Sequence, residues 1–209
     1  MATDDALIER IAGRLLSQPE EAVAEGDLQP DWLPEVPIDY PPVPAAVLIA
    51  LVQRGAGLSV LYTERSRDLR AHSGQISFPG GRVDPGDADA ADAALREAAE
   101  EVALDRRDAR VLGYMPRYYT GTNYLITPVV AVVEPSRPFI PNPAEVRSVF
   151  EVPLERLMRD ESYGTFRIRR GEKEHSSWQI QHGELTIWGI TANLTRRFHD
   201  LALAGEAIW

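Results

Sequence analysis

Three glutamates lie close together in the segment LREAAEEVAL, at positions 97, 100 and 101. If this segment is helical, Glu97, Glu100 and Glu101 gather on one face, because residues three and four apart are neighbours on an α-helix. Like charges at this spacing repel one another, and a divalent cation removes the repulsion. Carboxylate oxygens are hard ligands that suit Mg²⁺ or Mn²⁺. A solvated acidic face is the alternative, and for an isolated helix of this composition it would be preferred.

The loop before this segment favours a metal site. Residues 78–81 read FPGG, which places two glycines where the backbone turns sharply or comes close to another group. Asp84, Asp87 and Asp89 follow, and any of them could cap the helix. A helix cap alone does not need paired glycines. The combination therefore indicates a cradle for a metal ion and a phosphate group.

Residues 81–104 resemble the Nudix box, whose pattern is G-x5-E-x7-R-E-U-x-E-E-x-G-U, where U is aliphatic. Residues 96–104 match the second half, except that Ala103 replaces the glycine of the pattern. The first half is longer by one residue. Either Asp87 or Asp89 therefore stands beside the place of the loop glutamate, and the role of this acid is left open.

The resemblance to the Nudix box implies roles for five residues. Glu97 and Glu101 would ligate a metal ion, and Glu100 would be a third ligand or a base. The carbonyl of Gly81 would add a backbone ligand. Arg96 would pair with a neighbouring carboxylate and hold its orientation, which is a structural duty.

Residues 61–81, LYTERSRDLRAHSGQISFPGG, are similar to the signature of coenzyme A pyrophosphatases, L-L-T-x-R-S-x3-R-x3-G-x3-F-P-G-G, with Tyr62 as the departure. Coenzyme A carries a 3′-phosphate besides its diphosphate, and guanidinium groups suit phosphate recognition. This resemblance implies that Arg65, Arg70, His72 and Gly80 bind substrate. Surface solubility is the alternative for the arginines, and a hydrogen-bonded bystander is the alternative for the histidine.

Glu145 is a further candidate, outside the box, in the segment NPAEV at residues 142–146. In Nudix enzymes a glutamate outside the box often serves as a base or an extra metal ligand, and this segment resembles the place where the subgroup keeps one. An exposed glutamate at the start of a strand is the alternative interpretation.

The two resemblances imply a metal-dependent hydrolase that cuts the diphosphate linkage of coenzyme A or its derivatives. The products would be 3′,5′-ADP and 4′-phosphopantetheine. Metal ions would neutralise the phosphate oxygens and acidify the attacking water. A Nudix enzyme acting on ADP-ribose, dinucleotides or nucleoside triphosphates is one alternative. A catalytically silent nucleotide-binding module is another, although the chain retains all three box glutamates.

Composition excludes several other classes. The net charge of −10 argues against nucleic-acid binding, because phosphate backbones require a basic surface. No apolar run approaches the ~18–20 residues of a membrane span. The chain has no cysteine, and its first residues do not resemble a secretory signal. We therefore expect a cytoplasmic protein without membrane or nucleic-acid partners, for which a homodimer is one assembly to test.

The pattern of apolar residues predicts an α/β fold, and the resemblance implies a Nudix-type α/β/α sandwich with a mixed sheet. We expect one domain: an N-terminal helix and a proline-rich arm over residues 1–44, packed on a Nudix hydrolase domain over residues 45–209. Helices are expected at 4–17, 89–103 and 190–204. Strands are expected at 45–53, 57–63, 109–115, 124–133, 146–151 and 184–188, with a hairpin at 163–181.

Overall fold

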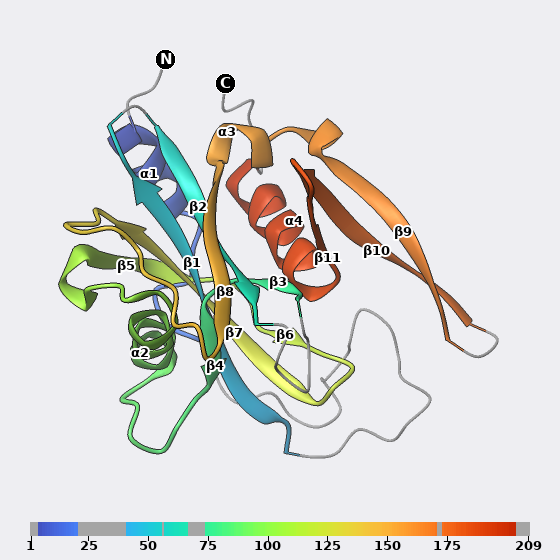
Figure 1. The fold of residues 1–209 in the computed structure, drawn as a ribbon, viewed down its shortest axis with the longest axis horizontal. Helices are drawn as coiled ribbons and strands as arrows, with labels where there is room; N and C mark the ends of the chain where they lie inside the picture. The colour runs from blue at the N-terminus through green and yellow to red at the C-terminus, as the bar shows by residue number, and fades with distance from the viewer. Residues whose placement is uncertain (1–3, 21–40, 56, 67–73, 171–172, 204–209) are drawn as a thin grey trace.

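The computed structural model describes residues 4–20, 41–55, 57–66, 74–170 and 173–203 (Figure 1). The helices are α1 (Asp4–Ala12), α2 (Ala90–Val102), α3 (Leu154–Leu157) and α4 (Ile190–Leu203), with 3-10 turns at Arg106–Asp108 and Asp160–Ser162. The strands are β1 (Val43–Gln53), β2 (Leu58–Arg65), β3 (Ile76–Ser77), β4 (Gly80–Arg82), β5 (Ala109–Tyr114), β6 (Tyr118–Tyr119), β7 (Tyr124–Val133), β8 (Val146–Pro153), β9 (Tyr163–Arg170), β10 (Lys173–His182) and β11 (Leu185–Trp188).

A mixed sheet of strands β1 to β8 forms the centre of the molecule. β1 pairs with β7 in parallel and with β2 in antiparallel orientation, and β8 lies antiparallel to the outer edge of β2. β1 and β7 are buried along most of their length, as expected for strands covered on both faces. The predicted mixed sheet is confirmed.

The short strands β3 and β4 determine where the site lies. β3 pairs with the end of β2, whereas β4 pairs with the beginning of β1. Residues 76–82 therefore fill the space that opens where β1 and β2 diverge. The backbone N–H of Leu48 also donates a 2.8 Å hydrogen bond to the carbonyl of Pro79. These contacts hold the two glycines of β4 beside α2.

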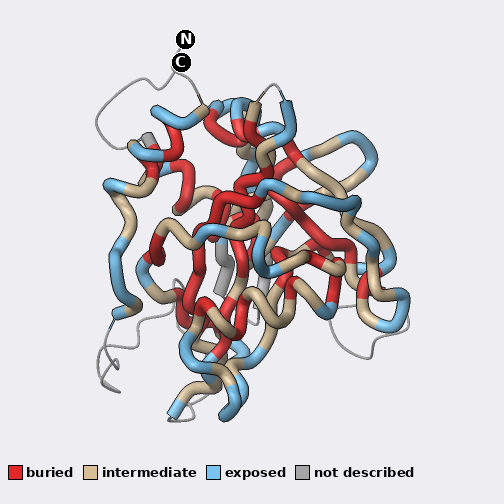
Figure 2. The backbone as a smooth tube through the Cα atoms, turned by 90° about the vertical axis from the view of Figure 1, so that its left-hand side faces the viewer, coloured by how far each residue is buried: buried red, intermediate tan, exposed pale blue. Residues whose placement is uncertain are grey.

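Two hydrophobic cores lie on the two faces of the sheet. Figure 2 shows the buried residues gathered in the middle of the molecule. On one face, α2 packs its alanines and Val102 against β1 and β7. On the other face, α1, α3 and α4 pack together with the apolar residues of β10 and β11. Figure 1 shows α2 and α4 on opposite sides of the central strands. Helices therefore flank the sheet, in agreement with the expected sandwich.

The C-terminal hairpin belongs to a separate three-stranded sheet of β9, β10 and β11. The predicted hairpin is confirmed, but a second sheet was not anticipated. Buried hydrogen bonds join α4 to the central sheet: the Tyr62 and Thr195 hydroxyls lie 3.0 Å apart, and Thr191 Oγ1 donates to the carbonyl of Ile76. This sheet and α4 together cover the face opposite α2.

The N-terminal helix is shorter than predicted, because α1 ends at Ala12 and Gly13 follows it. Its apolar face, with Leu7, Ile8 and Ile11, is buried in the core. Most of the proline-rich arm, residues 21–40, lies outside the described residues, so the division at residue 44 stays a prediction. Within the described ranges, no helix is long and apolar enough to cross a membrane.

Candidate active site

The structure shows what Asp87, Asp89 and Ala103, the irregular positions of the box, do at the two ends of α2. Asp89 caps the helix by accepting a 2.8 Å hydrogen bond from the N–H of Asp92. Asp87 instead receives both a 2.8 Å and a 3.0 Å hydrogen bond from the guanidinium of Arg96. The two acids thus have separate duties. At the other end, Ala103 adopts the left-handed conformation with φ 55°, which glycine would adopt without strain.

A cluster of three carboxylates forms where α2 meets the start of β8. Oxygen atoms of Glu97, Glu101 and Glu145 all lie within 4.8 Å of one another. Burial raises the pKa of Glu101 to about 8, and its side chain is only 2% exposed. Burial also raises the pKa of Glu97 above its usual range. A divalent cation would offset this accumulated charge, and the all-oxygen donor set suits Mg²⁺ or Mn²⁺.

Glu100 lies outside this cluster. Its side chain is 54% exposed and accepts a 3.3 Å hydrogen bond from Arg96 Nη1. The helix explains the separation, since Glu101 is rotated about 40° from Glu97 in one direction and Glu100 about 60° in the other. The structure thus brings together two of the three box glutamates and adds Glu145. A role for Glu100 as ligand or base stays a prediction.

Gly80 and Gly81 lie against the carboxylates. The N–H of Gly80 donates a 3.3 Å hydrogen bond to Glu101 Oε2. A Cβ atom on Gly81 would lie 2.4 Å from Glu97 Oε1, and one on Gly80 would lie 2.4 Å from the carbonyl oxygen of Ala46. No side chain fits at either position without displacing a neighbour. The glycines therefore allow the backbone of β4 to approach the cluster.

Arg96 holds the loop and the helix together. Besides Asp87, it donates a 3.0 Å hydrogen bond to Glu97 Oε1 and a 3.1 Å bond to the carbonyl of Arg82. These carboxylates raise the pKa of the Arg96 guanidinium, and Arg96 lowers the pKa of Asp87. This position suits the structural duty expected of Arg96.

Of the predicted substrate-binding side chains, Arg65 is placed at the cluster. Its Nη1 lies 3.7 Å from Oε1 of Glu101. Arg70 and His72 lie outside the described residues, so their assignments stay predictions.

The position of Glu145 depends on Asn142, a residue to which the sequence analysis gave no role. The N–H of Asn142 donates a 2.8 Å hydrogen bond to the carbonyl of Glu101, and its own carbonyl accepts a 3.0 Å bond from the N–H of Glu145. Asn142 Oδ1 accepts a further bond from the N–H of Ala144. The carbonyl of Glu145 accepts a 2.8 Å bond from the N–H of Ser66, which ties it to the end of β2. An Asn-Pro turn directly before the glutamate was the available signal.

Comparisons with known proteins identify the family of this chain. The NUDIX domain family model matches residues 42–173. The uncharacterized Nudix hydrolase NudL of Escherichia coli strain K12 is 42% identical over 159 residues, which cover 76% of this chain and 81% of that protein. The NudL protein of Citrobacter koseri has the same identity and coverage. The chain belongs to the Nudix family.

Among solved structures, DR0079 from Deinococcus radiodurans gives a TM-score of 0.49 at 18% identity, covering 74% of this chain and 82% of that one. Nudix hydrolases act on phosphorus-containing anhydrides and generally use divalent metal ions. The family model spans the segment that resembles the Nudix box, which carries Glu97, Glu101 and the Arg96–Asp87 pair.

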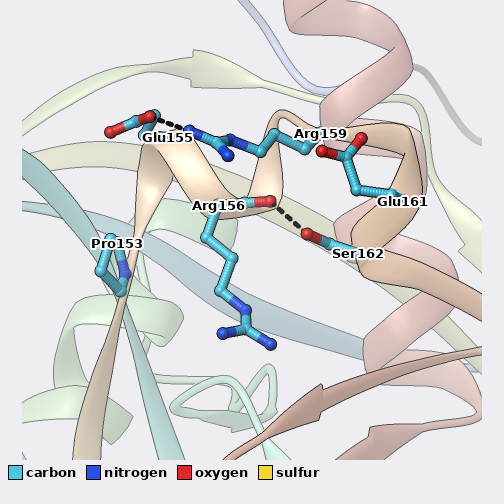
Figure 3. Close-up of a pocket in the computed structure, with 6 residues that line it drawn as sticks. All are labelled: Pro153, Glu155, Arg156, Arg159, Glu161 and Ser162. Atoms are coloured by element: carbon cyan, nitrogen blue, oxygen red, sulfur yellow. Dashed lines mark hydrogen bonds and ion pairs between the residues drawn. The ribbon is translucent and has the colours of Figure 1, made fainter.

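A surface pocket of about 420 Å³ lies elsewhere on the molecule (Figure 3). It is lined by Pro153, Glu155, Arg156, Arg159, Glu161 and Ser162. Pro153 ends β8, whereas Glu145 directly precedes the first residue of this strand. Because eight extended residues span roughly 25 Å, the pocket is remote from the carboxylates. Arginines and glutamates face it from the same short segment, and two of them, Arg159 and Glu155, pair with each other.

Proposed function

We propose that this Nudix hydrolase cleaves the diphosphate linkage of coenzyme A or its derivatives, giving 3′,5′-ADP and 4′-phosphopantetheine. One observation carries the proposal: the cluster of Glu97, Glu101 and Glu145 lies against the glycines that end the segment resembling the coenzyme A pyrophosphatase signature. The same segment contributes Arg65 to the cluster.

The donor set fits a divalent cation, Mg²⁺ or Mn²⁺, which would neutralise phosphate oxygens and lower the pKa of water. Glu97 and Glu101 would hold this cation, with the backbone of Gly81 as a neighbouring ligand. Glu145 would be either a further ligand or the base that accepts the proton of the attacking water. Glu100 is kept as an alternative base.

The arginines of the upstream segment would recognise phosphate groups. Because Arg65 lies 3.7 Å from Glu101, we assign it to the diphosphate. The signature then leaves Arg70 for the 3′-phosphate that distinguishes coenzyme A, with His72 and Gly80 as further substrate contacts. Two phosphate-binding positions would match the two phosphorylated parts of this substrate.

A Nudix hydrolase specific for ADP-ribose, dinucleotides or nucleoside triphosphates is the alternative within the family. A catalytically silent nucleotide-binding module is the alternative outside it. The buried Glu101 argues against the second, because a protein without a cation at this position would bury a carboxylate at a cost. We also propose a cytoplasmic protein that acts on small molecules rather than nucleic acids or membranes, and either a monomer or a homodimer.

A product-resolved assay tests the substrate. Coenzyme A, dephospho-coenzyme A, ADP-ribose and a dinucleotide are incubated with Mg²⁺, with Mn²⁺ and after exhaustive EDTA treatment. We expect cation-dependent release of 3′,5′-ADP from coenzyme A at the highest kcat/KM of the set. Faster turnover of ADP-ribose would transfer the assignment to the first alternative, and no turnover of any substrate would favour the silent module.

The variant Arg70→Ala then tests recognition of the 3′-phosphate. Loss of a charge-assisted hydrogen bond of about 1.5–3 kcal/mol lowers kcat/KM for coenzyme A by roughly 10- to 150-fold. Dephospho-coenzyme A, which lacks this phosphate, should be affected far less. Equal losses on both substrates would mean that Arg70 does not recognise the 3′-phosphate.

A further inference from the structure

Arg65 and Arg96 both lie beside box glutamates, but they are held in different ways. Arg96 is fixed by directed hydrogen bonds to Asp87, to Glu97 and to a backbone carbonyl. In the part of the chain that the structure describes, Arg65 has one ion pair, with Glu101, at 3.7 Å, which is longer than a hydrogen bond. Its Nε atom is buried and has no hydrogen-bond partner among the described residues. Charge attraction, rather than a set of hydrogen bonds, therefore holds the Arg65 guanidinium in place.

The backbone of Arg65 is held by hydrogen bonds, whereas within the described ranges its guanidinium has only the ion pair given above. The N–H of Arg65 donates a 2.9 Å hydrogen bond to the carbonyl of Gln75. The pairing of β2 with β8 shifts between Glu64, which lies opposite Ser148, and Arg65, which lies opposite Val146. Irregularities of this kind redirect a side chain relative to the regular sheet. A change of partner by Arg65 would therefore involve its side chain and not its backbone.

The partner of Arg65 is the carboxylate that a cation would also need. Glu101 is nearly fully buried and is one of the three clustered glutamates. A cation held by Glu97, Glu101 and Glu145 would place positive charge beside the Arg65 guanidinium. The two would compete for one carboxylate and repel each other.

We propose that Arg65 is the counter-ion of the ionised Glu101 carboxylate in the metal-free protein, that a divalent cation displaces it, and that the displaced guanidinium binds a phosphate oxygen of the substrate diphosphate. This inference rests on the proposed function and deepens it. It makes phosphate recognition by Arg65 depend on an occupied metal site, so the cation and the diphosphate bind cooperatively.

The proposal and a purely structural role of Arg65 predict opposite changes in cation affinity when Arg65 is removed. If Arg65 only positioned Glu101, its removal would disorder a metal ligand and weaken cation binding. If Arg65 competes with the cation, its removal strengthens cation binding. Mn²⁺ affinity without substrate, measured from the electron paramagnetic resonance signal of the free ion, separates the two roles.

We expect Arg65→Ala to bind Mn²⁺ about three- to tenfold more tightly than the wild type. Arg65→Lys, which keeps the charge, should remain close to the wild type and shows whether the charge matters. Arg54→Ala is the matched control, because Arg54, directly after β1, pairs with Glu151 of β8 at 3.0 Å, outside the carboxylate cluster. Thermal unfolding in EDTA shows that each variant is folded.

The second half of the proposal is tested with adenosine 5′-(α,β-methylene)diphosphate, whose bridge resists hydrolysis. At saturating Mn²⁺, Arg65→Ala should bind this probe about tenfold more weakly than the wild type, as expected for a lost charge-assisted hydrogen bond. Without metal, the two proteins should bind it alike, because Glu101 then engages Arg65.

Unchanged or weaker Mn²⁺ binding by Arg65→Ala would overturn this inference, and so would unchanged binding of the probe at saturating Mn²⁺. In either case a wild type that binds Mn²⁺ and hydrolyses its substrate would leave the proposed function intact. A wild type that binds no Mn²⁺ would instead overturn both.

Discussion

At the residue scale, Glu101 combines burial, an ion pair with Arg65 and a hydrogen bond from the N–H of Gly80. Glu101→Gln should lower kcat by roughly 10²-fold or more, because it removes charge from the metal site. The neutral amide avoids the desolvation of a carboxylate, so the melting temperature of the metal-free variant should be no lower than that of the wild type. Steady-state kinetics and calorimetry measure the two effects.

Glu100→Gln is the matched comparison for this variant. Glu100 is exposed and lies outside the cluster. Glu100→Gln should therefore lower kcat clearly less than Glu101→Gln does. A loss of equal size would instead support Glu100 as the base. Near-normal kcat in both variants would mean that neither carboxylate contributes to catalysis.

The stability of the metal-free protein should depend on pH because of Glu101. The pKa of Glu101 rises from 4.5 to about 8 on folding, so the folded state binds the proton more tightly than the unfolded state. Its contribution to stability is complete below pH 4.5 and is lost as the pH rises through about 8. In EDTA, the melting temperature should therefore fall between pH 6 and pH 9, and Glu101→Gln should show a smaller fall. Parallel profiles for the two proteins would contradict this.

At the element scale, the end of α2 carries a local strain that can be removed. Ala103 has φ 55°, a conformation that glycine adopts more readily. Ala103→Gly should raise the free energy of unfolding by about 1 kcal/mol, measured by urea denaturation. The same substitution inside the last turn of the helix, Ala99→Gly, should lower it by about 1 kcal/mol. A destabilising Ala103→Gly would show that the left-handed conformation does not limit the stability of this helix end.

At the scale of the whole molecule, the proposed cation site joins α2, β4 and the start of β8, so an ion bound there would stabilise contacts between distant segments. A ligand that binds the folded state at 100 times its Kd adds about 2.7 kcal/mol of stability. Mg²⁺ or Mn²⁺ should therefore raise the melting temperature of the wild type, and EDTA should reverse the change. Glu101→Gln should respond weakly, and Na⁺ at equal ionic strength controls for screening. A similar rise in both proteins would place the ion elsewhere.

Most of the long elements could be predicted from local patterns. The helix expected at 89–103 is observed at Ala90–Val102, and the strand expected at 124–133 has those bounds. Their apolar residues repeat with the period of a helix or form a continuous buried run, which neighbouring residues alone specify. Strands β3, β4 and β6 were missed because two or three residues show no period. The separate sheet of β9 to β11 was missed because the pattern of a strand does not identify its partners.

The sequence by itself determined that Glu97 and Glu101 share a helix face, because neighbours on a helix follow from its 3.6-residue turn. The resemblance to the Nudix family and the pair of glycines just before the helix could also be recognised in the sequence. Only the tertiary structure decided that Glu145 joins the cluster, that the side of α2 with Glu101 rather than Glu100 faces it, and that Arg65 lies against Glu101. These relations depend on the pairing of β2 with β8 and on hydrogen bonds between segments distant in the chain. No local spacing specifies such contacts, because they arise only when the sheet has brought the segments together.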